Sequence, residues 1–587
     1  MNLLLELNQI AQNAFEKAGF DPKYGAVQVS NRPDLCEYQI NGALSAAKEY
    51  HKAPIMIAQA VLPYLAENEA FSKAEAVAPG FINLDLSAPF LARFVAQMAC
   101  SERFGAETGE ARTIVVDYGG PNVAKPLHVG HLRSAIIGES VKRILAYMGN
   151  ECIGDTHLGD WGLQIGLIIM RLQEMHPELP YFDEQYEGAY PEEAPFTISE
   201  LEVIYPEASK KSKEDPEFAE KAHLATVELQ KGRRGYRALW QHIINVSVAD
   251  LKKNYDNLDV HFELWKKESD AEPFIPELLQ TLREKGLARY SEGALVVDVQ
   301  EETDKVQVPP CIVQKSDGGS LYATTDLATV IMRMKEISPD DIIYFADKRQ
   351  ELHYTQFFRV SRKAELVKPE TGLTFIGFGT INGTDGKALK TREGGVVRLE
   401  TLIADVHEKV REKMRLRYGD EELDPETVHR IALSALKYGD LMNQAGKNYI
   451  MDFDRFTSFE GNTGPYILYT TVRIRSILRK AGAQEGQLDS EALKALRVDT
   501  ASLKTLLKTA AQWPAMMEGA AKELAPHKIC AFLHDLSDAF NSFYHETSIL
   551  YEEDEKQKSA YIELLKFILK LLTTGIHLLG FDAPEKM

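Results

Sequence analysis

The pattern of apolar and polar residues divides the chain into three parts. Residues 1 to about 105 open with helical spacing and end in PGFINLDLS, where alternating apolar residues predict a strand. From residue 111 a β-rich run (TIVVDY), a Gly/Pro-rich loop, a helical stretch and a second β-rich run (NECIGD) follow in turn. This order is typical of a parallel βαβ unit. Beyond about residue 425 helical spacing continues to the last residues.

Strand and helix patterns alternate again near residues 290–400, in segments such as ALVVDV, DIIYFAD and LTFIGFG. A helical, charged stretch at about 170–285 separates them from the first βαβ pattern. We therefore expect an α/β multidomain protein with an α+β domain over 1–105, an α/β domain over 106–425 with this insertion, and an all-α bundle over 426–587.

Composition places the chain among ordinary globular proteins. Of 587 residues, 44% are hydrophobic and 26% are charged, which argues against disorder, collagen-like repeats and a membrane protein. The net charge of -20 argues against a polyanionic partner. The charge is unevenly spread, however, because 171–220 holds 14 acidic and 4 basic residues, whereas 461–480 holds 4 basic residues and no acidic one.

Cysteine usage and the amino end bear on location. The five cysteines include no CxxC pair, so they predict buried thiols in a reducing compartment rather than a zinc site or a disulfide framework. The first twenty residues lack the basic and unbroken apolar regions of a signal peptide, and no run approaches the roughly 18 apolar residues of a membrane span. We expect a cytoplasmic protein.

The segment from Asp117 to His131, DYGGPNVAKPLHVGH, carries the clearest chemistry. His128 and His131 stand three residues apart at the start of a predicted helix, where free backbone N–H groups favour an anion, and Gly130 leaves room for a nucleotide. Two satisfied histidines, or a metal site that lacks a nearby third ligand, are the alternatives. The preceding strand and PNVAK string favour phosphate binding.

This segment resembles a known family. HVGH at 128–131 matches the HIGH signature of class I aminoacyl-tRNA synthetases, and PNVAKPLHVGHLRSAIIG resembles arginyl-tRNA synthetases of the bacterial type. Similar stretches follow in order over nearly the whole chain, at 157–166, 316–328, 346–358, 459–469 and 578–587. The resemblance implies a tRNA-contacting amino-terminal domain, a Rossmann-like parallel-sheet catalytic domain and a helical anticodon-binding domain.

The implied activity joins L-arginine to tRNA(Arg) in two steps. ATP and arginine form arginyl-adenylate and pyrophosphate, and the arginine then passes to the 2′-OH of the 3′-terminal adenosine. Mg²⁺ would accompany ATP, and we expect no protein-held metal, no membrane partner and a monomer. The alternatives are a non-catalytic tRNA-binding paralogue and a small-molecule nucleotidyltransferase; the latter would not explain a helical tail of domain size.

The second family signature, KMSKS, is degenerate at 383–395, GTDGKALKTREGG. A solvated turn is the alternative to a mobile phosphate-binding loop, which the resemblance favours. The resemblance implies catalytic roles, as fixed positive charge around the reacting phosphate, for Lys125, His128, His131 and Lys390. The implied ATP-binding residues are Pro121, Asn122, Val123, Ala124, Lys125, Pro126, Leu127, His128, Val129, Gly130, His131, Lys387 and Lys390.

A pocket for a guanidinium should present carboxylates and neutral acceptors, since this cation is planar and permanently charged. By resemblance, the arginine-binding residues are Asp117, Asn122, Tyr322, Asp326 and Gln350. Tyr322 and Asp326 would share one helical face. The alternative for Asp326 is an N-cap before LATVIMRM.

The resemblance also implies tRNA contacts in the helical tail, with Tyr466, Tyr469 and Arg473 as the proposed residues. Basic side chains beside aromatic rings suit single-stranded RNA. In the alternative, the tyrosines are core residues and the arginines a solvated face. From the charge distribution we expect tRNA to meet the tail and 111–150, and to stay away from 171–220, which we place outside the active site.

Overall fold

The computed structural model describes residues 1–587 except 126, 388, 390–396 and 420–422. The chain divides into two compact units, which are described separately. Unit 1 consists of Met1–Gly109, Asp420–Tyr438 and Thr457–Met587, and unit 2 of Glu110–Gly419 and Gly439–Phe456.

The amino-terminal part of unit 1 is an α+β fold, as its apolar pattern predicts. Its four strands form an antiparallel sheet in the order β1-β2-β4-β3. The strands are β1 (Val27–Val29), β2 (Tyr38–Ile40), β3 (Phe71–Val77) and β4 (Phe81–Leu86), and the helices are α1 (Leu3–Lys17), α2 (Gly42–Tyr50), α3 (Pro54–Ala66) and α4 (Ala88–Cys100). β4 is the strand that PGFINLDLS predicts.

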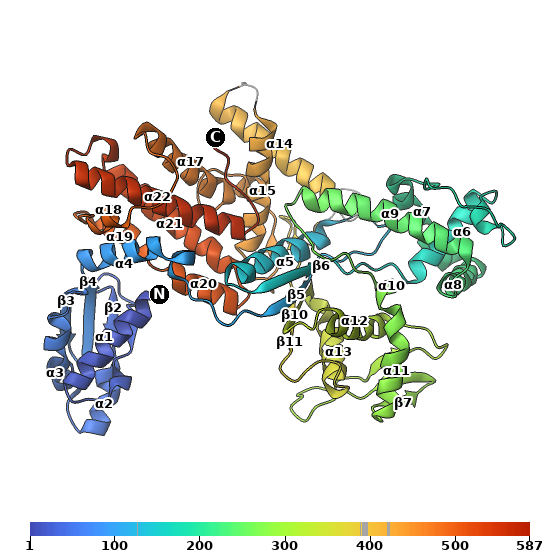
Figure 1. Ribbon diagram of the computed structural model, residues 1–587, viewed down its shortest axis with the longest axis horizontal. Helices are drawn as coiled ribbons and strands as arrows, with labels where there is room; N and C mark the ends of the chain where they lie inside the picture. The colour runs from blue at the N-terminus through green and yellow to red at the C-terminus, as the bar shows by residue number, and fades with distance from the viewer. Residues whose placement is uncertain (126, 388, 390–396, 420–422) are drawn as a thin grey trace. The chain divides into compact units, whose positions relative to one another are not determined.

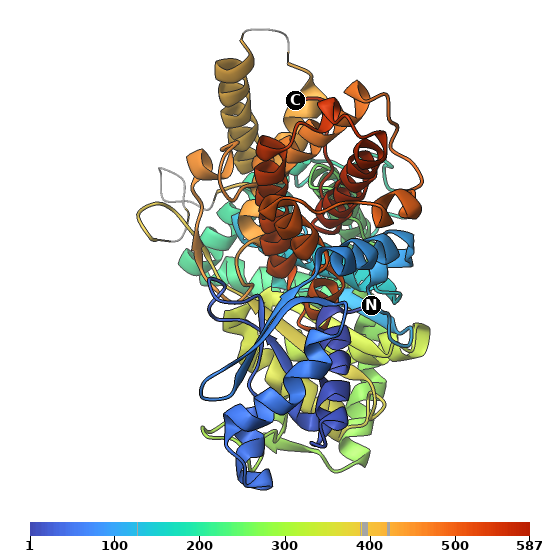
Figure 2. The same cartoon turned by 90° about the vertical axis from the view of Figure 1, so that its left-hand side faces the viewer.

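The rest of unit 1 is a helical bundle, whose last helices are drawn in orange to red (Figure 2). Its helices are most of α15 (Pro425–Leu441), α17 (Gly464–Lys480), α18 (Ser490–Lys494), α19 (Ala501–Ala510), α20 (Trp513–Lys522), α21 (Pro526–Glu546) and α22 (Glu555–Leu578). The carboxylate of Glu37, in the amino-terminal fold, pairs with Lys504 and Lys508 of α19, each at 3.2 Å. These ion pairs join the amino-terminal fold to the bundle.

Unit 2 is built on a parallel sheet in the order β11-β10-β5-β6. Its strands are β5 (Thr113–Asp117), β6 (Glu151–Asp155), β10 (Asp341–Asp347) and β11 (Gly372–Phe378). From β5 the chain passes through α5 (Val129–Tyr147) to β6 on one side, whereas β10 leads to β11 on the other. Such a reversal opens a crevice at the carboxyl ends of the two central strands, where doubly wound folds bind ligands.

Helices cover both faces of this sheet (Figure 1). On one face Val115, Ile342 and Tyr344 pack against α12 (Tyr322–Glu336) and α13 (Glu351–Lys363), and α5 lies on the other. Alternate strand residues point to opposite faces, which is why both sets of positions are apolar. A small antiparallel sheet and α11 (Ile275–Glu284) join the first core; its strands are β7 (Ala288–Ser291), β8 (Ala294–Val297) and β9 (Cys311–Gln314).

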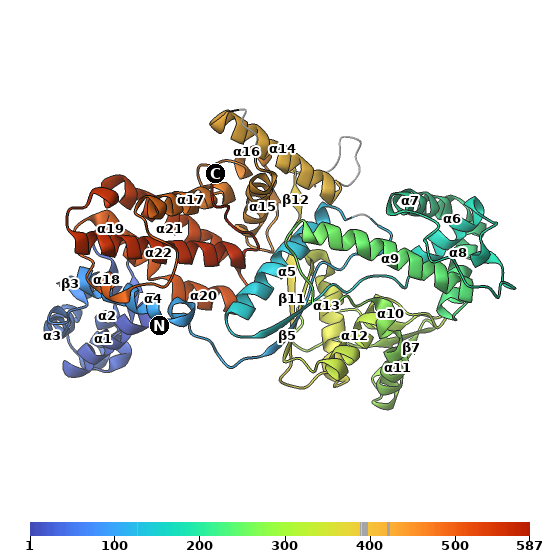
Figure 3. The same ribbon diagram turned by 45° about the horizontal axis from the view of Figure 1, so that its top comes forward.

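A helical region lies between β6 and the rest of unit 2. It contains α6 (Leu163–Met175), α7 (Ile198–Glu214), α8 (Pro216–Gln230) and α9 (Arg234–Asp256), followed by the short α10 (Glu268–Ala271). Leu167, Ala208, Phe218 and Ala222 form its core. The long helix α9 runs from these helices back toward the sheet (Figure 3).

Two segments complete unit 2. After β11, β12 (Ile381–Asn382) pairs in parallel with β13 (Tyr449–Ile450). In chain order, α14 (Leu399–Tyr418) lies between these two strands and α16 (Phe453–Phe456) follows the second. Among the described residues, no helix is long and apolar enough to cross a membrane.

Candidate functional site

The loop that follows β5 is fixed by contacts from two other segments. Asn122 forms a β-bridge with Gly159, and a side chain at Gly159 would overlap the Asn122 amide. Ala124 has a positive φ of 60°, and its N–H donates to Ser247 Oγ of α9 at 2.9 Å. A non-glycine residue with positive φ needs such support from its surroundings. The loop is therefore held in place by its contacts with Gly159 and Ser247.

The two histidines of this loop cap α5. His128 is the N-cap, and its Nδ1 accepts from the Gly130 N–H at 3.0 Å, while His131 Nδ1 accepts from the His128 N–H at 3.1 Å. Since both Nδ1 atoms act as acceptors, both Nε2 atoms carry the proton when the rings are neutral. The rings lie 3.9 Å apart between centroids. Gly130 makes this cap possible, because a Cβ there would lie 2.8 Å from the His128 ring.

The surroundings of both rings favour their neutral form. Burial, and then the charge of Lys125, lowers the pKa of His128. Burial, and then the charges of His128 and Lys125, lower the pKa of His131 to about 3. From the sequence, these histidines are expected to supply positive charge. The structure instead makes them a pair of neutral N–H donors at a helix amino end, where an anion is favoured.

Lys125 supplies the positive charge beside them. Its Nζ lies 4.7 Å from the centroid of the Tyr205 ring, which α7 contributes. This contact corrects the expectation that 171–220 lies outside the active site. The expectation rests on the net charge of the stretch, and net charge does not show that one of its tyrosines packs against the loop.

Asp117, at the carboxyl end of β5, is held by a buried arginine. Arg333 Nη2 donates to Asp117 Oδ2 and to Asp155 Oδ2, each at 2.6 Å. The Asp117 side chain remains 19% exposed, whereas that of Asp155 is fully buried. Burial raises the pKa of Asp117, and Arg333 opposes this shift. One carboxylate of the predicted arginine pocket thus already carries an internal guanidinium on one oxygen.

The other predicted carboxylate, Asp326, lies inside α12. The helix begins at Tyr322, so the interpretation of Asp326 as an N-cap is wrong. Leu321 is the N-cap instead, and the Thr324 hydroxyl, inside the first turn, accepts from the Leu321 N–H at 3.0 Å. Asp326 Oδ2 lies 2.5 Å from His353 Nε2 of α13. Tyr322, one turn earlier on the same face, is 66% exposed.

Three residues near these carboxylates were missed in the sequence. Burial, and then the charges of Asp117 and Asp326, raises the pKa of Tyr354, so its ring lies near both acids. Burial, followed by Asp326 and Asp160, raises the pKa of Glu268 to about 7. His353 and Tyr354 stand in the same quoted stretch as Gln350, but Glu268 lies in the predicted insertion and no spacing signals it.

Of the remaining predicted site residues, some lie in the part of the chain that the structure describes and others lie outside it. Gln350 ends a 3-10 turn (Lys348–Gln350) after β10 and is exposed. Lys387 is exposed in a turn in which its carbonyl accepts from the Gly383 N–H at 2.8 Å. Pro126 and Lys390 lie outside the described residues.

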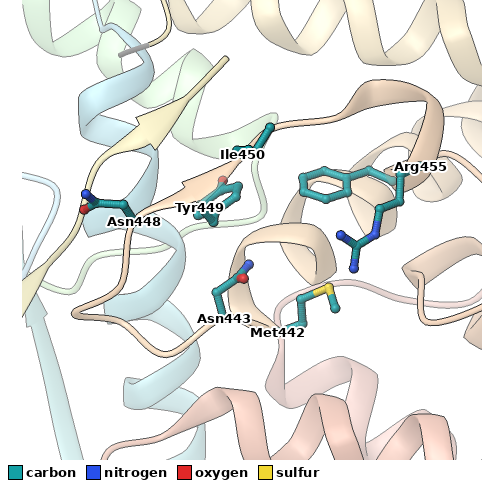
Figure 4. A pocket seen from close by; sticks show the side chains of 7 residues that line it. Met442, Asn443, Asn448, Tyr449, Ile450 and Arg455 are labelled. Atoms are coloured by element: carbon teal, nitrogen blue, oxygen red, sulfur yellow. The ribbon is translucent and has the colours of Figure 1, made fainter. Parts of the chain in front are cut away.

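A pocket of about 330 Å³ lies beside the segment that leads into 383–395 (Figure 4). Its lining residues are Met442, Asn443, Asn448, Tyr449, Ile450, Arg455 and Phe456. Asn448 Oδ1 accepts from the Thr380 N–H at 2.9 Å and from Lys348 Nζ at 3.2 Å. The pocket wall therefore braces the carboxyl ends of β10 and β11.

In unit 1, the aromatic and basic residues predicted to contact tRNA form one cluster on α17 and α21. The Arg473 guanidinium lies 4.7 Å from the Tyr469 ring and donates to Asn541 at 2.6 Å, and Tyr466 donates to Asp538 at 2.6 Å. These side chains are half-buried, so the tyrosines are not core residues. Arg475 and Arg479 instead donate to carbonyls of the carboxyl-terminal segment 583–585.

Comparison with known families gives three matches in chain order. Residues 5–86 match the arginyl tRNA synthetase N terminal domain, residues 94–453 the catalytic domain of class I tRNA synthetases (R), and residues 467–587 the DALR anticodon binding domain.

Full-length relatives have the same organisation. The chain is 56% identical to the arginine–tRNA ligase of Agathobacter rectalis, with 99% of each chain covered, and 52% identical to that of Alkaliphilus oremlandii, with 100% of each covered. The crystal structure of arginyl-tRNA synthetase from Plasmodium falciparum aligns with a TM-score of 0.80 at 25% identity and covers 100% of this chain and 99% of its own.

Proposed function

The chain belongs to the arginyl-tRNA synthetase family and is an arginine–tRNA ligase, and from this premise we propose which residues carry each step. One observation supports the assignment most directly. In unit 2, two neutral histidine donors and Lys125 lie on the loop that follows strand β5. The same unit contains the acids Asp117, at the end of β5, and Asp326, on α12. This combination suits a substrate with a cationic side chain and a reaction at phosphate.

Activation is a displacement at the α-phosphate of ATP. An oxygen of the arginine carboxylate forms a bond to the α-phosphorus, and the bond to the bridging oxygen breaks and releases pyrophosphate. The nucleophile is already ionised, so the site must align the groups and stabilise charge. We assign the Nε2–H groups of His128 and His131, the amino end of α5 and the Lys125 ammonium to this charge. Lys390 and Pro126 keep their sequence-based assignments, and Mg²⁺ enters as part of the ATP substrate.

Arginine recognition uses the acids at the strand ends and on α12. We propose that Asp326 and the free oxygen of Asp117 accept hydrogen bonds from the guanidinium, and that Asn122, Tyr322 and Gln350 orient the rest of the amino acid. A lysine ammonium lacks the planar fork of donors and would leave acceptors unpaired. Asp326 is positioned by His353, which lies at 2.5 Å.

Transfer completes the reaction. The 2′ oxygen of the terminal adenosine forms a bond to the arginyl carbonyl carbon and loses its proton to solvent, and the anhydride bond breaks and releases AMP. We propose that tRNA(Arg) contacts the cluster of Tyr466, Tyr469 and Arg473, where a cation lies against aromatic rings. We further propose the domain limits 1–105, 106–425 and 426–587, a monomeric protein and a cytoplasmic location.

One assay tests the function. The purified protein is mixed with MgATP, total tRNA and each of the twenty amino acids, and aminoacyl-tRNA is measured. We expect arginine alone to be charged. Charging of another amino acid, or no charging by a folded preparation, would contradict the proposal. A nucleotidyltransferase would consume ATP without charging tRNA, and a tRNA-binding paralogue would bind tRNA without consuming ATP.

A further inference from the structure

We propose that Tyr205, on helix α7, is a positioning residue that holds Lys125 in place for the activation step. The inference rests on the proposed function, because that function gives Lys125 its role beside the reacting phosphate. It adds a residue from the acidic stretch 171–220, to which none of the predicted site residues belongs.

The contact between the two side chains is a ring–ammonium contact. Lys125 Nζ lies 4.7 Å from the centroid of the Tyr205 ring. Within the described part of the chain, Lys125 has no carboxylate at ion-pair distance. A ring face attracts an ammonium without cancelling its charge, whereas a carboxylate would neutralise it. The contact therefore orients Lys125 and leaves its full charge available to a phosphate.

The Tyr205 ring is itself fixed. It packs against the core of the helical region, which contains Leu167, Ala208 and Phe218. α7 begins with a reciprocal cap, in which Glu200 N–H donates to Thr197 Oγ1 and Thr197 N–H donates to Glu200 Oε2. The ring thus stands on a folded element and not on a loop, which is what a positioning residue requires.

The same face of α7 is also attached to the histidine loop. Glu202 lies one turn before Tyr205, is 11% exposed, and pairs with Arg398 at 2.7 Å. Arg398 forms an antiparallel bridge with His128, and the Val129 N–H donates to the Val397 carbonyl at 3.0 Å. α7 therefore connects to Lys125 through Tyr205 and to the backbone at His128 through Glu202.

Tyr205 also acts electrostatically on the predicted arginine pocket. Lys125 is close enough to His128 and His131 to lower the pKa of both. Burial, then Glu268, and then Tyr205 raise the pKa of Tyr322 in the predicted arginine pocket. A single ring thus lies beside the lysine of the phosphate side and near the tyrosine of the arginine side.

The test compares Tyr205→Leu, which removes the ring, with Tyr205→Phe, which keeps it. Arginine-dependent ATP–pyrophosphate exchange is measured with tRNA present, together with thermal unfolding. We expect Tyr205→Leu to lower kcat/KM for ATP about three- to tenfold, as loss of a ring–ammonium contact predicts. KM for arginine should change less than about twofold, and Tyr205→Phe should match the wild type.

Two controls separate positioning from general damage to the helical region. Tyr190→Leu removes another half-buried ring of this region, which faces Arg234 at 5.4 Å, and should leave exchange unchanged. In a Lys125→Met background, Tyr205→Leu should have no further effect, since the double-mutant cycle then has no contact left to break. The Leu and Phe pair decides the matter even if Lys125→Met leaves too little exchange to measure.

The inference is overturned if Tyr205→Leu matches the wild type, if Tyr205→Phe loses as much as Tyr205→Leu, or if the loss persists in full without Lys125. Failure of the proposed function would look different. The wild-type protein itself would then show no arginine-dependent exchange, and the inference would fall with it.

Discussion

Unit 2 contains two buried arginine–carboxylate clusters that share their chemistry and differ in what surrounds them. In the first, Arg133 of α5 pairs with both oxygens of Asp440 and donates to the carbonyls of Gly379 and Lys447. Tyr449 also donates to Asp440, which is fully buried. In the second, Arg333 pairs with Asp117 and Asp155, and Asp117 keeps 19% of its side chain exposed.

The difference shows how one kind of interaction serves two purposes. The Arg133 cluster balances one cation against one anion and is closed by protein groups on every described side. The Arg333 cluster sets one cation against two anions, with His157 alongside at 3.8 Å from Asp155. A buried excess of negative charge is costly unless a cation compensates it. We infer that the guanidinium of the substrate supplies this compensation at Asp117.

The largest expected effect comes from removing either arginine. Arg133→Met and Arg333→Met should each lower the free energy of unfolding by about 3–5 kcal/mol, because a buried carboxylate loses its partner. Only Arg333→Met should also raise KM for arginine, because burial and the Asp155 charge then raise the pKa of Asp117 with His157 alone opposing them, which disfavours the charged form of the carboxyl.

Circular dichroism during denaturation gives the stability, and aminoacylation kinetics below the unfolding transition give KM. The paired variants control for each other, since each loses one buried guanidinium. Equal KM values for arginine in the two variants would show that the Arg333 cluster is structural in the same way as the other.

Replacing the carboxylates sharpens the comparison without a change of shape. Asp117→Asn should raise KM for arginine about tenfold to a hundredfold, the size of one lost hydrogen bond to a charged group. Asp440→Asn should leave that KM within about twofold and lower only the unfolding midpoint. Initial rates of aminoacylation at varied arginine measure both. A Michaelis constant that rises as much for Asp440→Asn would remove the distinction between an open and a closed cluster.

These clusters also show what the sequence can and cannot predict. The alternation in TIVVDY and the helical spacing after it predict β5 and α5, and the HVGH string predicts the capping histidines, because both signals are local. Arg333 stands in a strongly helical stretch, where an arginine is expected to lie at the surface. It meets Asp117 and Asp155 only because the strand order places β5 between β10 and β6. Glu268 and Tyr205 come from the inserted region, and no spacing in the sequence relates them to the loop.

A local signal also misled at one position. Asp after two threonines predicts an N-cap at Asp326, but α12 begins four residues earlier. Thr324 satisfies both the Leu321 N–H and, through its hydroxyl, the Val313 carbonyl at 2.8 Å. Tertiary contacts of the first turn thus override the cap preference. Asp326 therefore lies inside the helix, where its carboxylate contacts His353.

The smallest expected effect is the dependence of stability on pH that His157 gives the Arg333 cluster. Burial lowers the pKa of His157, but the Asp155 carboxylate, which lies 3.8 Å from its Nδ1, outweighs this and raises the pKa above its usual value. A raised histidine pKa gives stability that is complete below about pH 6.5 and is lost as the pH rises through the raised value. The wild type should therefore lose stability as the pH rises above about 6.5, by no more than about 1.4 kcal/mol per pH unit.

His157→Gln keeps a hydrogen-bonding side chain but cannot titrate, so the slope should flatten in this variant. Asp440→Asn, in the cluster without a histidine, should keep the wild-type slope at a lower overall stability. Unfolding midpoints measured at half-unit steps across this range distinguish the two. If His157→Gln retains the full slope, the titrating group lies elsewhere, and the Arg333 cluster holds its excess negative charge at every pH at which the enzyme works.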